Sequence, residues 1–158
     1  MSIQRLMEEI IDNFNKQQQL YIKIDDLSGE QLDLLADEQW LNKQEQLNEL
    51  LQKRQIINKE IDVLNSHNKS LQEQVTMQLN LQEFVLSRLE SKLEEAQYQS
   101  LCQVVAGLGD ILAKINKTDE QNQIFIKKKA GPDRVNPQAN PQQAQNAYHQ
   151  AVKQGKKR

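Results

Sequence analysis

The sequence is poor in the residues that build tight turns and sheets. It contains five glycines and three prolines in 158 residues, and aromatic residues make up 4% of the chain. Tight turns draw on glycine and proline, and strands are enriched in aromatic side chains, so a sheet protein with many reversals is excluded. Helix is therefore the predicted class.

The residues that bind metals and form disulfides are equally scarce. One cysteine and two histidines cannot assemble a disulfide framework or a metal cluster. The cysteine, Cys102, lies among Leu101, Val104 and Val105 and is predicted to be a small buried hydrophobe. Neither a nucleophile with a nearby base nor a phosphate-binding loop is found, so we predict no enzyme activity, no cofactor, no metal and no small-molecule substrate.

Long apolar runs are also missing. No stretch of about 18 apolar residues occurs, which excludes a transmembrane helix on length grounds. Residues 1–12 alternate charged and apolar side chains and lack the apolar core of a signal peptide. These two observations predict a cytoplasmic protein with no membrane span.

The net charge of −2 hides two oppositely charged parts. Residues 1–126 hold 12 Lys and Arg against 21 Asp and Glu, a balance of −9, whereas residues 127–158 hold 8 against 1, a balance of +7. An acidic body followed by a basic tail predicts either two surfaces with different partners or a tail that folds back on the body through charge attraction.

A heptad pattern from Trp40 to Leu93 organises the rest of the chain. With Leu47 at position a, the seam residues recur at alternating spacings of three and four, which is typical of helices that pack at a shallow angle. Arg54 and Asn68 interrupt the seam at a positions, where a polar residue costs stability but fixes register or partner number. The alternative is that either residue is simply solvated where the bundle opens. The seam comprises Leu47, Leu50, Arg54, Ile57, Ile61, Leu64, Asn68, Leu71, Val75, Gln78, Gln82, Val85, Leu89 and Lys92.

Turn signals near the N-terminus divide the first part of the chain. An amphipathic helix is predicted over residues 2–25, followed by a break over residues 25–29. A second helix is predicted to start near Gly29, after a serine with the spacing of a capping box. Trp40 is expected on the apolar stripe of this second helix, in a packing role.

The middle of the seam contains the next predicted reversal. Residues 65–70 concentrate side chains that compete for backbone hydrogen bonds, so we predict a turn there, with His67 as a turn residue and a third helix from Leu71 to Leu93. The alternative is one unbroken helix to about Ala96, because no glycine or proline intervenes.

A last apolar set runs from Leu101 to Ile115 and continues to residues 124–126. Gly107 and Gly109 lie within it, and each costs roughly 1 kcal/mol relative to alanine, so they weaken the helix or mark a close helix crossing. The residues Gly131 and Pro132 are predicted to stop the helix.

The composition changes after this stop. We predict a helical domain over residues 1–130 and a low-complexity basic tail over residues 131–158, with a short helix over 143–153. The fold class is all-α: an elongated antiparallel helical bundle or coiled-coil hairpin of three to four long helices with a flexible C-terminal tail. Nucleic-acid binding would rest on the tail, which has one aromatic residue and no reading module, so no sequence-specific recognition is expected.

Three segments resemble the flagellar export chaperones of the FlgN and FliT types. Residues 49–57, with the sequence ELLQKRQII, are similar to their leucine-rich helix with a central arginine; residues 108–115 resemble their apolar run; and residues 119–123, DEQNQ, resemble their Asn-containing C-terminal helix. The resemblance covers roughly residues 30–130 and leaves the choice between the two types open. The basic tail is outside the family core, and Asp119 stands where FlgN-type sequences often have asparagine.

The resemblance implies a cytoplasmic, non-enzymatic chaperone of type III flagellar secretion. It implies protein partners, namely hook-associated or filament-cap subunits and the export apparatus. It also implies that the C-terminal helix binds the client, through Leu108, Ile111, Ile115, Asn122, Ile124 and Phe125. For Phe125, core packing and an exposed docking surface are both open. The alternative function is a structural coiled coil that acts by homodimerisation through the heptad seam.

Overall fold

The first helix is longer than its sequence predicts. The structure, a computed structural model, describes residues 1–130, and α1 runs unbroken over Ile3–Ala36. Ser2 caps it, because its Oγ accepts a hydrogen bond from the backbone N–H of Arg5 at 3.2 Å. The predicted break at residues 25–29 and the second helix start near Gly29 are wrong. Ser28 does not cap a new helix but lies fully buried within α1.

The first reversal lies at residues 37–43 instead. The carboxylate of Asp37 accepts hydrogen bonds from the backbone N–H of Gln39 at 2.8 Å and from Lys43 Nζ at 2.6 Å. The 3₁₀ turn η1, Trp40–Lys43, follows. Trp40 therefore belongs to the connection and not to a long helix as predicted, although it packs in a half-buried position against the core, as its predicted role requires.

The second long helix, α2, spans Gln44–Leu79, so the predicted reversal over residues 65–70 is wrong. His67 lies within the helix, with Nε2 2.9 Å from Oε1 of Glu9 on α1. The alternative of one helix to Ala96 is also wrong, because α2 ends at Asn80, whose φ of 56° is left-handed. Asparagine is among the few side chains that enter this region at low cost, which explains why no glycine is needed here.

The remaining helices begin after this turn. A single-turn helix, α3, covers Leu86–Leu89, and α4 covers Glu95–Ala130. The predicted third helix from Leu71 to Leu93 is therefore wrong, because its first part belongs to α2 and only α3 follows within this range. Gly107 lies inside α4 at a close crossing, as its position suggested. A Cβ built on it would lie 2.5 Å from Nε2 of Gln18 on α1.

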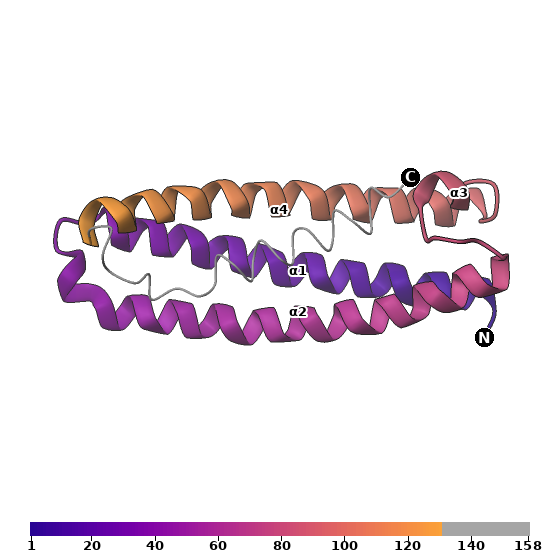
Figure 1. The fold of residues 1–158 in the computed structure, drawn as a ribbon, viewed down its shortest axis with the longest axis horizontal. Coiled ribbons are helices and arrows are strands. Elements are labelled where there is room, and N and C mark those ends of the chain that lie inside the picture. The colour runs from indigo at the N-terminus through magenta and orange to yellow at the C-terminus, as the bar shows by residue number, and fades with distance from the viewer. Residues whose placement is uncertain (131–158) are drawn as a thin grey trace.

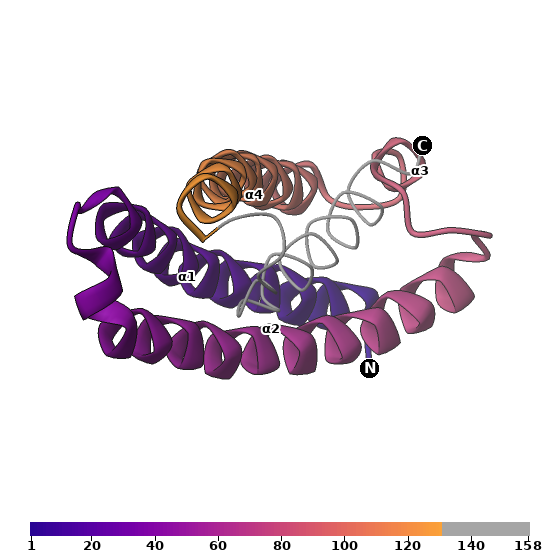
Figure 2. The ribbon, with the colours of Figure 1, turned by 60° about the vertical axis from the view of Figure 1, so that its left-hand side comes forward.

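The three long helices form an elongated all-α bundle, as predicted. Figure 1 shows α1 and α2 running antiparallel, with α4 returning in the direction of α1. Both α2 and α4 pack along α1, and Figure 2 shows them on different sides of it. Helix α1 is therefore the central element, and α2 and α4 do not pack along each other.

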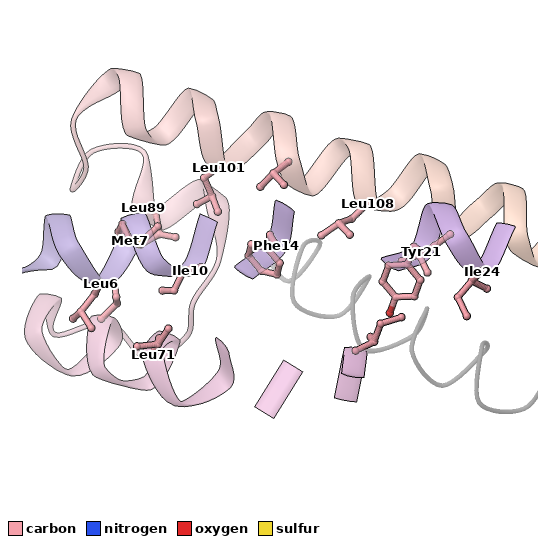
Figure 3. Packing of buried hydrophobic residues seen from close by; sticks show 14 of the residues in the cluster. Leu6, Met7, Ile10, Phe14, Tyr21, Ile24, Leu71, Leu89, Leu101 and Leu108 are labelled. Carbon is pink, nitrogen blue, oxygen red and sulfur yellow. The ribbon is translucent and has the colours of Figure 1, made fainter. Parts of the chain in front are cut away.

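The core follows α1 along its whole length. Figure 3 shows leucine, isoleucine and aromatic side chains from α1, α2, α3 and α4 in one large cluster, which extends from the α3 end along α1 to Ile24. A smaller cluster closes the opposite end, where Leu35, Leu47, Leu51 and Ile126 are buried and Trp40 and Phe125 pack against them. Within residues 1–130, no helix carries an apolar stretch long enough to cross a membrane. The predicted tail over 131–158, its short helix over 143–153 and the helix stop at Gly131 and Pro132 lie outside the described residues.

Candidate partner-binding surface

The buried face of α2 includes the a positions of the predicted seam, but it is rotated from the predicted a and d stripe toward the e positions. All five a positions are buried: Leu47, Arg54, Ile61, Asn68 and Val75. At the d positions, Leu50 and Leu71 are buried but Ile57 and Leu64 between them are only half-buried, whereas the e positions Leu51, Asn58, Asn65 and Gln72 are all buried. The covered face of α2 therefore follows a and e along its length, and its d edge is partly open only around Ile57 and Leu64.

A buried ion pair joins the two outer helices. Arg54 of α2 is fully buried and Asp119 of α4 is 5% exposed, and their two pairs of nitrogen and oxygen atoms are each 2.9 Å apart. Ser28 of α1 donates a third hydrogen bond to Asp119 at 3.0 Å, and Gln31 accepts one from Arg54 at 3.3 Å. This bidentate geometry pairs the two charges, although the buried Nε of Arg54 has no hydrogen-bond partner, and it constrains how far α2 and α4 are shifted along α1.

The sequence predicted half of this pair. An arginine at an a position indicates a residue that sets register, and Arg54 does so by bonding to Asp119. The partner was missed, although one signal exists: Asp119 continues the helical spacing of Leu112 and Ile115, so an acid stands in the apolar stripe of α4. Asn122 continues the same stripe and donates to the carbonyl oxygen of Ser28 at 3.2 Å.

A row of amides lines the contact between α1 and α2. Asn13 Nδ2 donates to Asn68 Oδ1 at 2.8 Å, and Asn68 Nδ2 donates to the backbone carbonyl of Ile10 at 3.3 Å. One turn further, Gln17 Nε2 donates to Asn65 Oδ1. Such pairs favour the observed alignment of the two helices, because separating them would leave buried amides without partners.

Tyr21 ends this polar row on α1. Figure 3 shows its ring between the helices, with the hydroxyl directed away from α4. Burial, and next the negative charge of Asp62, raise the pKa of the Tyr21 hydroxyl well above its usual range. Burial also raises the pKa of Asp62. The Tyr21 hydroxyl thus stays neutral, and we assign it a packing role and no acid–base role.

An apolar hollow opens on the d edge of α2. It has a volume of about 370 Å³ and is lined by Leu27 of α1 and by Ile56 and Ile57 of α2, with Lys23, Asp26 and Lys53 at its rim. Ile56 stands at a c position, outside the predicted seam, and is 60% exposed. A large β-branched side chain exposed to this degree beside a hollow is available to a protein partner.

The client-binding residues predicted on α4 do not form one surface. Leu108, Ile115 and Asn122 are buried, while Ile111 and Phe125 are half-buried. Only Ile124, at 61% exposed, is open to a partner in this arrangement. For Phe125, the structure supports core packing, because it lies against the smaller apolar cluster.

The described residues offer little for metal or thiol chemistry. No group of three or more His, Cys, Asp or Glu suited to hold a metal ion occurs among residues 1–130. Cys102 was predicted to be a small buried hydrophobe, but it is only half-buried. Its side chain lies on the flank of α4 next to Leu101, which takes the fully buried position.

Comparison with known protein families, curated proteins and solved structures finds no match to this chain. The case for a function therefore rests on the surfaces described above.

Proposed function

We propose that this chain is a cytoplasmic, non-enzymatic chaperone of the FlgN and FliT type, which binds hook-associated or filament-cap subunits of the bacterial flagellum before export. The observation that carries the proposal is the apolar hollow between α1 and α2, with Ile56 exposed at its edge. A chaperone of this kind needs such a surface to cover an apolar client segment.

The shape of the hollow favours a helical client. It lies in the shallow seam between two antiparallel helices, where an amphipathic helix places one or two apolar side chains between the ridges of the host. Full burial of an isoleucine contributes roughly 1.5–3 kcal/mol, so one anchor at Ile56 gives a reversible contact. Reversibility suits a chaperone that must release its client for export.

The charges at the rim set a preference among clients. Lys23 and Lys53 stand on opposite sides of the hollow, on α1 and α2, and Asp26 lies beside them. Two lysines against one acid favour a client helix that carries an acidic side chain next to its apolar anchor. Such contacts at an exposed rim act mainly on the association rate.

The alternative of a homodimer through the heptad seam has less support. The a positions of the seam are buried against α1 and, at Arg54, bonded to α4 within one chain. A second copy could use this seam only if the bundle opened. The exposed hollow needs no such rearrangement.

The test is a binding measurement with a purified hook-associated or filament-cap subunit. Ile56→Ser removes the exposed apolar anchor, and we expect at least a tenfold loss of affinity with unchanged helicity by circular dichroism. Val63→Ser is the matched control, because Val63 is a β-branched residue of the same helix, is 69% exposed and does not line the hollow. It should bind like the wild type.

A third variant separates the two candidate sites. Ile124→Ser changes the exposed residue of the surface predicted on α4. If Ile124→Ser loses the client and Ile56→Ser does not, the client binds α4 and the hollow is not the site. If wild-type protein binds none of these subunits, the proposed function is wrong.

A further inference from the structure

The charges beside the apolar hollow are placed symmetrically along α2. Lys53 stands three residues before Ile56, and Glu60 stands three residues after Ile57. Because Lys53 and Glu60 are seven residues apart, they lie in one row of the helix, and both are exposed. The midpoint of this row falls between Ile56 and Ile57, which both line the hollow.

Helix α1 has the same order of charges across the hollow. Lys23 and Asp26 are exposed at its rim, with the base before the acid and a midpoint at residues 24–25. Because these two side chains and Lys53 line one hollow, the midpoints on α1 and α2 lie level with each other. In the described part of the chain, the ion pairs involve other charges, so Lys23, Asp26, Lys53 and Glu60 are available to a partner.

A row with a base on one side of its midpoint and an acid on the other is complementary to its own reverse. A two-fold axis through the hollow, perpendicular to the helices, sets α1 and α2 of a second copy antiparallel to α1 and α2 of the first. Lys53 then faces Glu60 of the second copy, and Lys23 faces its Asp26. Two α2 helices paired parallel and in register would instead place like charges opposite each other.

The same rotation brings the apolar side chains of the two copies together. Ile56 is 60% exposed and falls opposite Ile57 of the second copy, at the edge of the other hollow. Burial of these side chains supplies the attraction, and the charges set the direction of the helices. Helices α1 and α2 of both copies then form an antiparallel four-helix arrangement.

We propose that a second copy of this chain binds the outer face of α1 and α2, with the two-fold axis at the hollow. This dimer differs from a coiled coil through the heptad seam, because the a positions stay buried within each chain. It does not rest on the proposed chaperone function. It does occupy the same hollow, so a second copy and a client helix exclude each other there.

Sedimentation equilibrium of the purified full-length chain, without any client, tests the charge pairing. The wild type should show a monomer–dimer equilibrium. Lys53→Glu and Glu60→Lys should each raise the dimer dissociation constant at least about tenfold, because each places two pairs of like charges in the interface. The double variant Lys53→Glu with Glu60→Lys restores both pairs in reverse and should return to the wild-type value.

The control for charge alone is Lys59→Glu. Lys59 is exposed on α2 and does not line the hollow, and it stands outside the row of Lys53 and Glu60. This variant changes the net charge as much as Lys53→Glu does. It should dimerise like the wild type.

Two nitroxide labels test the direction of the helices. In a Cys102→Ser background, labels at Met77→Cys should lie roughly 60 Å apart in the dimer, because Met77 is about 20 residues from the axis on each copy. Labels at Gln55→Cys, beside the axis, should lie within about 30 Å of each other. Electron double resonance measures both distances, and a parallel dimer would give short distances at both positions.

Three results would overturn the proposal. The first is a wild-type chain that stays monomeric at all concentrations up to about 1 mM. The second is a double variant that dimerises no better than the single variants while its helicity by circular dichroism matches the wild type. The third is a pair of equal distances at positions 55 and 77. None of these measurements involves a client, so they leave the test of the proposed function separate.

Discussion

Arg54 of α2 and Asp119 of α4 form a bidentate ion pair across the bundle, with both nitrogen–oxygen distances at 2.9 Å. Neither helix packs along the other, so this pair joins α2 directly to α4, while α1 supports it through Ser28 and Gln31. A buried pair of this kind adds little net stability but makes the loss of one partner costly. It is therefore a constraint on helix alignment.

Replacing one member of this pair should destabilise the bundle strongly. We expect Arg54→Met to lower the free energy of unfolding by about 3–5 kcal/mol, because Asp119 would stay buried without its counter-charge. The double variant Arg54→Met with Asp119→Leu should recover most of that loss. Urea unfolding followed by circular dichroism measures both changes.

The control is an ion pair at the surface of the same bundle. Lys114 of α4 lies 3.1 Å from Asp25 of α1, with its side chain 69% exposed. Lys114→Met should change stability by less than about 1 kcal/mol. If it matches the effect of Arg54→Met, burial is not what makes the Arg54 pair costly to break.

The helical class and the elongated bundle could be predicted from the sequence, because periodicity and composition act locally. The reversals could not. Ser28, Asn65 and Asn68 have side chains that compete for local backbone bonds, yet each bonds to a residue 48 to 91 positions away. Local patterns do not distinguish a turn residue from one that bonds across a helix interface.

The same limit applies to the candidate surface. The family resemblance implied a client-binding face on α4, but Leu108 and Ile115 are buried in the core cluster. The hollow between α1 and α2 at Ile56 depends on the rotation of α2 about its axis. The buried a and e positions determine this rotation. One local signal was present: Ile56 is an apolar residue outside the heptad seam.

The left-handed residue that ends α2 gives a second prediction. Asn80 has a φ of 56°, which costs roughly 1–2 kcal/mol for most residues with a Cβ and nothing for glycine. We expect Asn80→Ala to lower the free energy of unfolding by about 1 kcal/mol and Asn80→Gly to leave it unchanged or raise it slightly. Parallel urea titrations compare the two, and equal destabilisation would contradict a backbone origin.

The two glycines inside α4 form a matched pair. A Cβ at Gly109 meets nothing within 4 Å, so Gly109→Ala should stabilise the protein by about 0.5–1 kcal/mol through helix propensity. A Cβ at Gly107 would lie 2.5 Å from the flexible end of Gln18, so Gly107→Ala should gain less. Adding Gln18→Ala to Gly107→Ala removes the contact and should recover the missing part of the stability gain. Thermal unfolding measures all three, and equal gains at both glycines would argue against the crossing contact.

The buried phenol of Tyr21 predicts a loss of stability at alkaline pH. Its pKa is raised in the folded state above the ordinary value near 10, first by burial and then by Asp62. Above pH 10 the unfolded chain therefore releases this proton before the folded chain does, and the free energy of unfolding falls as the pH rises. The phenylalanine side chain in Tyr21→Phe cannot ionise, so this variant should lose less of its free energy of unfolding between pH 9 and about pH 11.5 than the wild type.

Asp62→Asn removes the negative charge that also raises the Tyr21 pKa. The Tyr21 ionisation, followed by ultraviolet absorbance, should therefore move to lower pH in this variant. An unchanged alkaline slope in Tyr21→Phe would show that another group controls the transition.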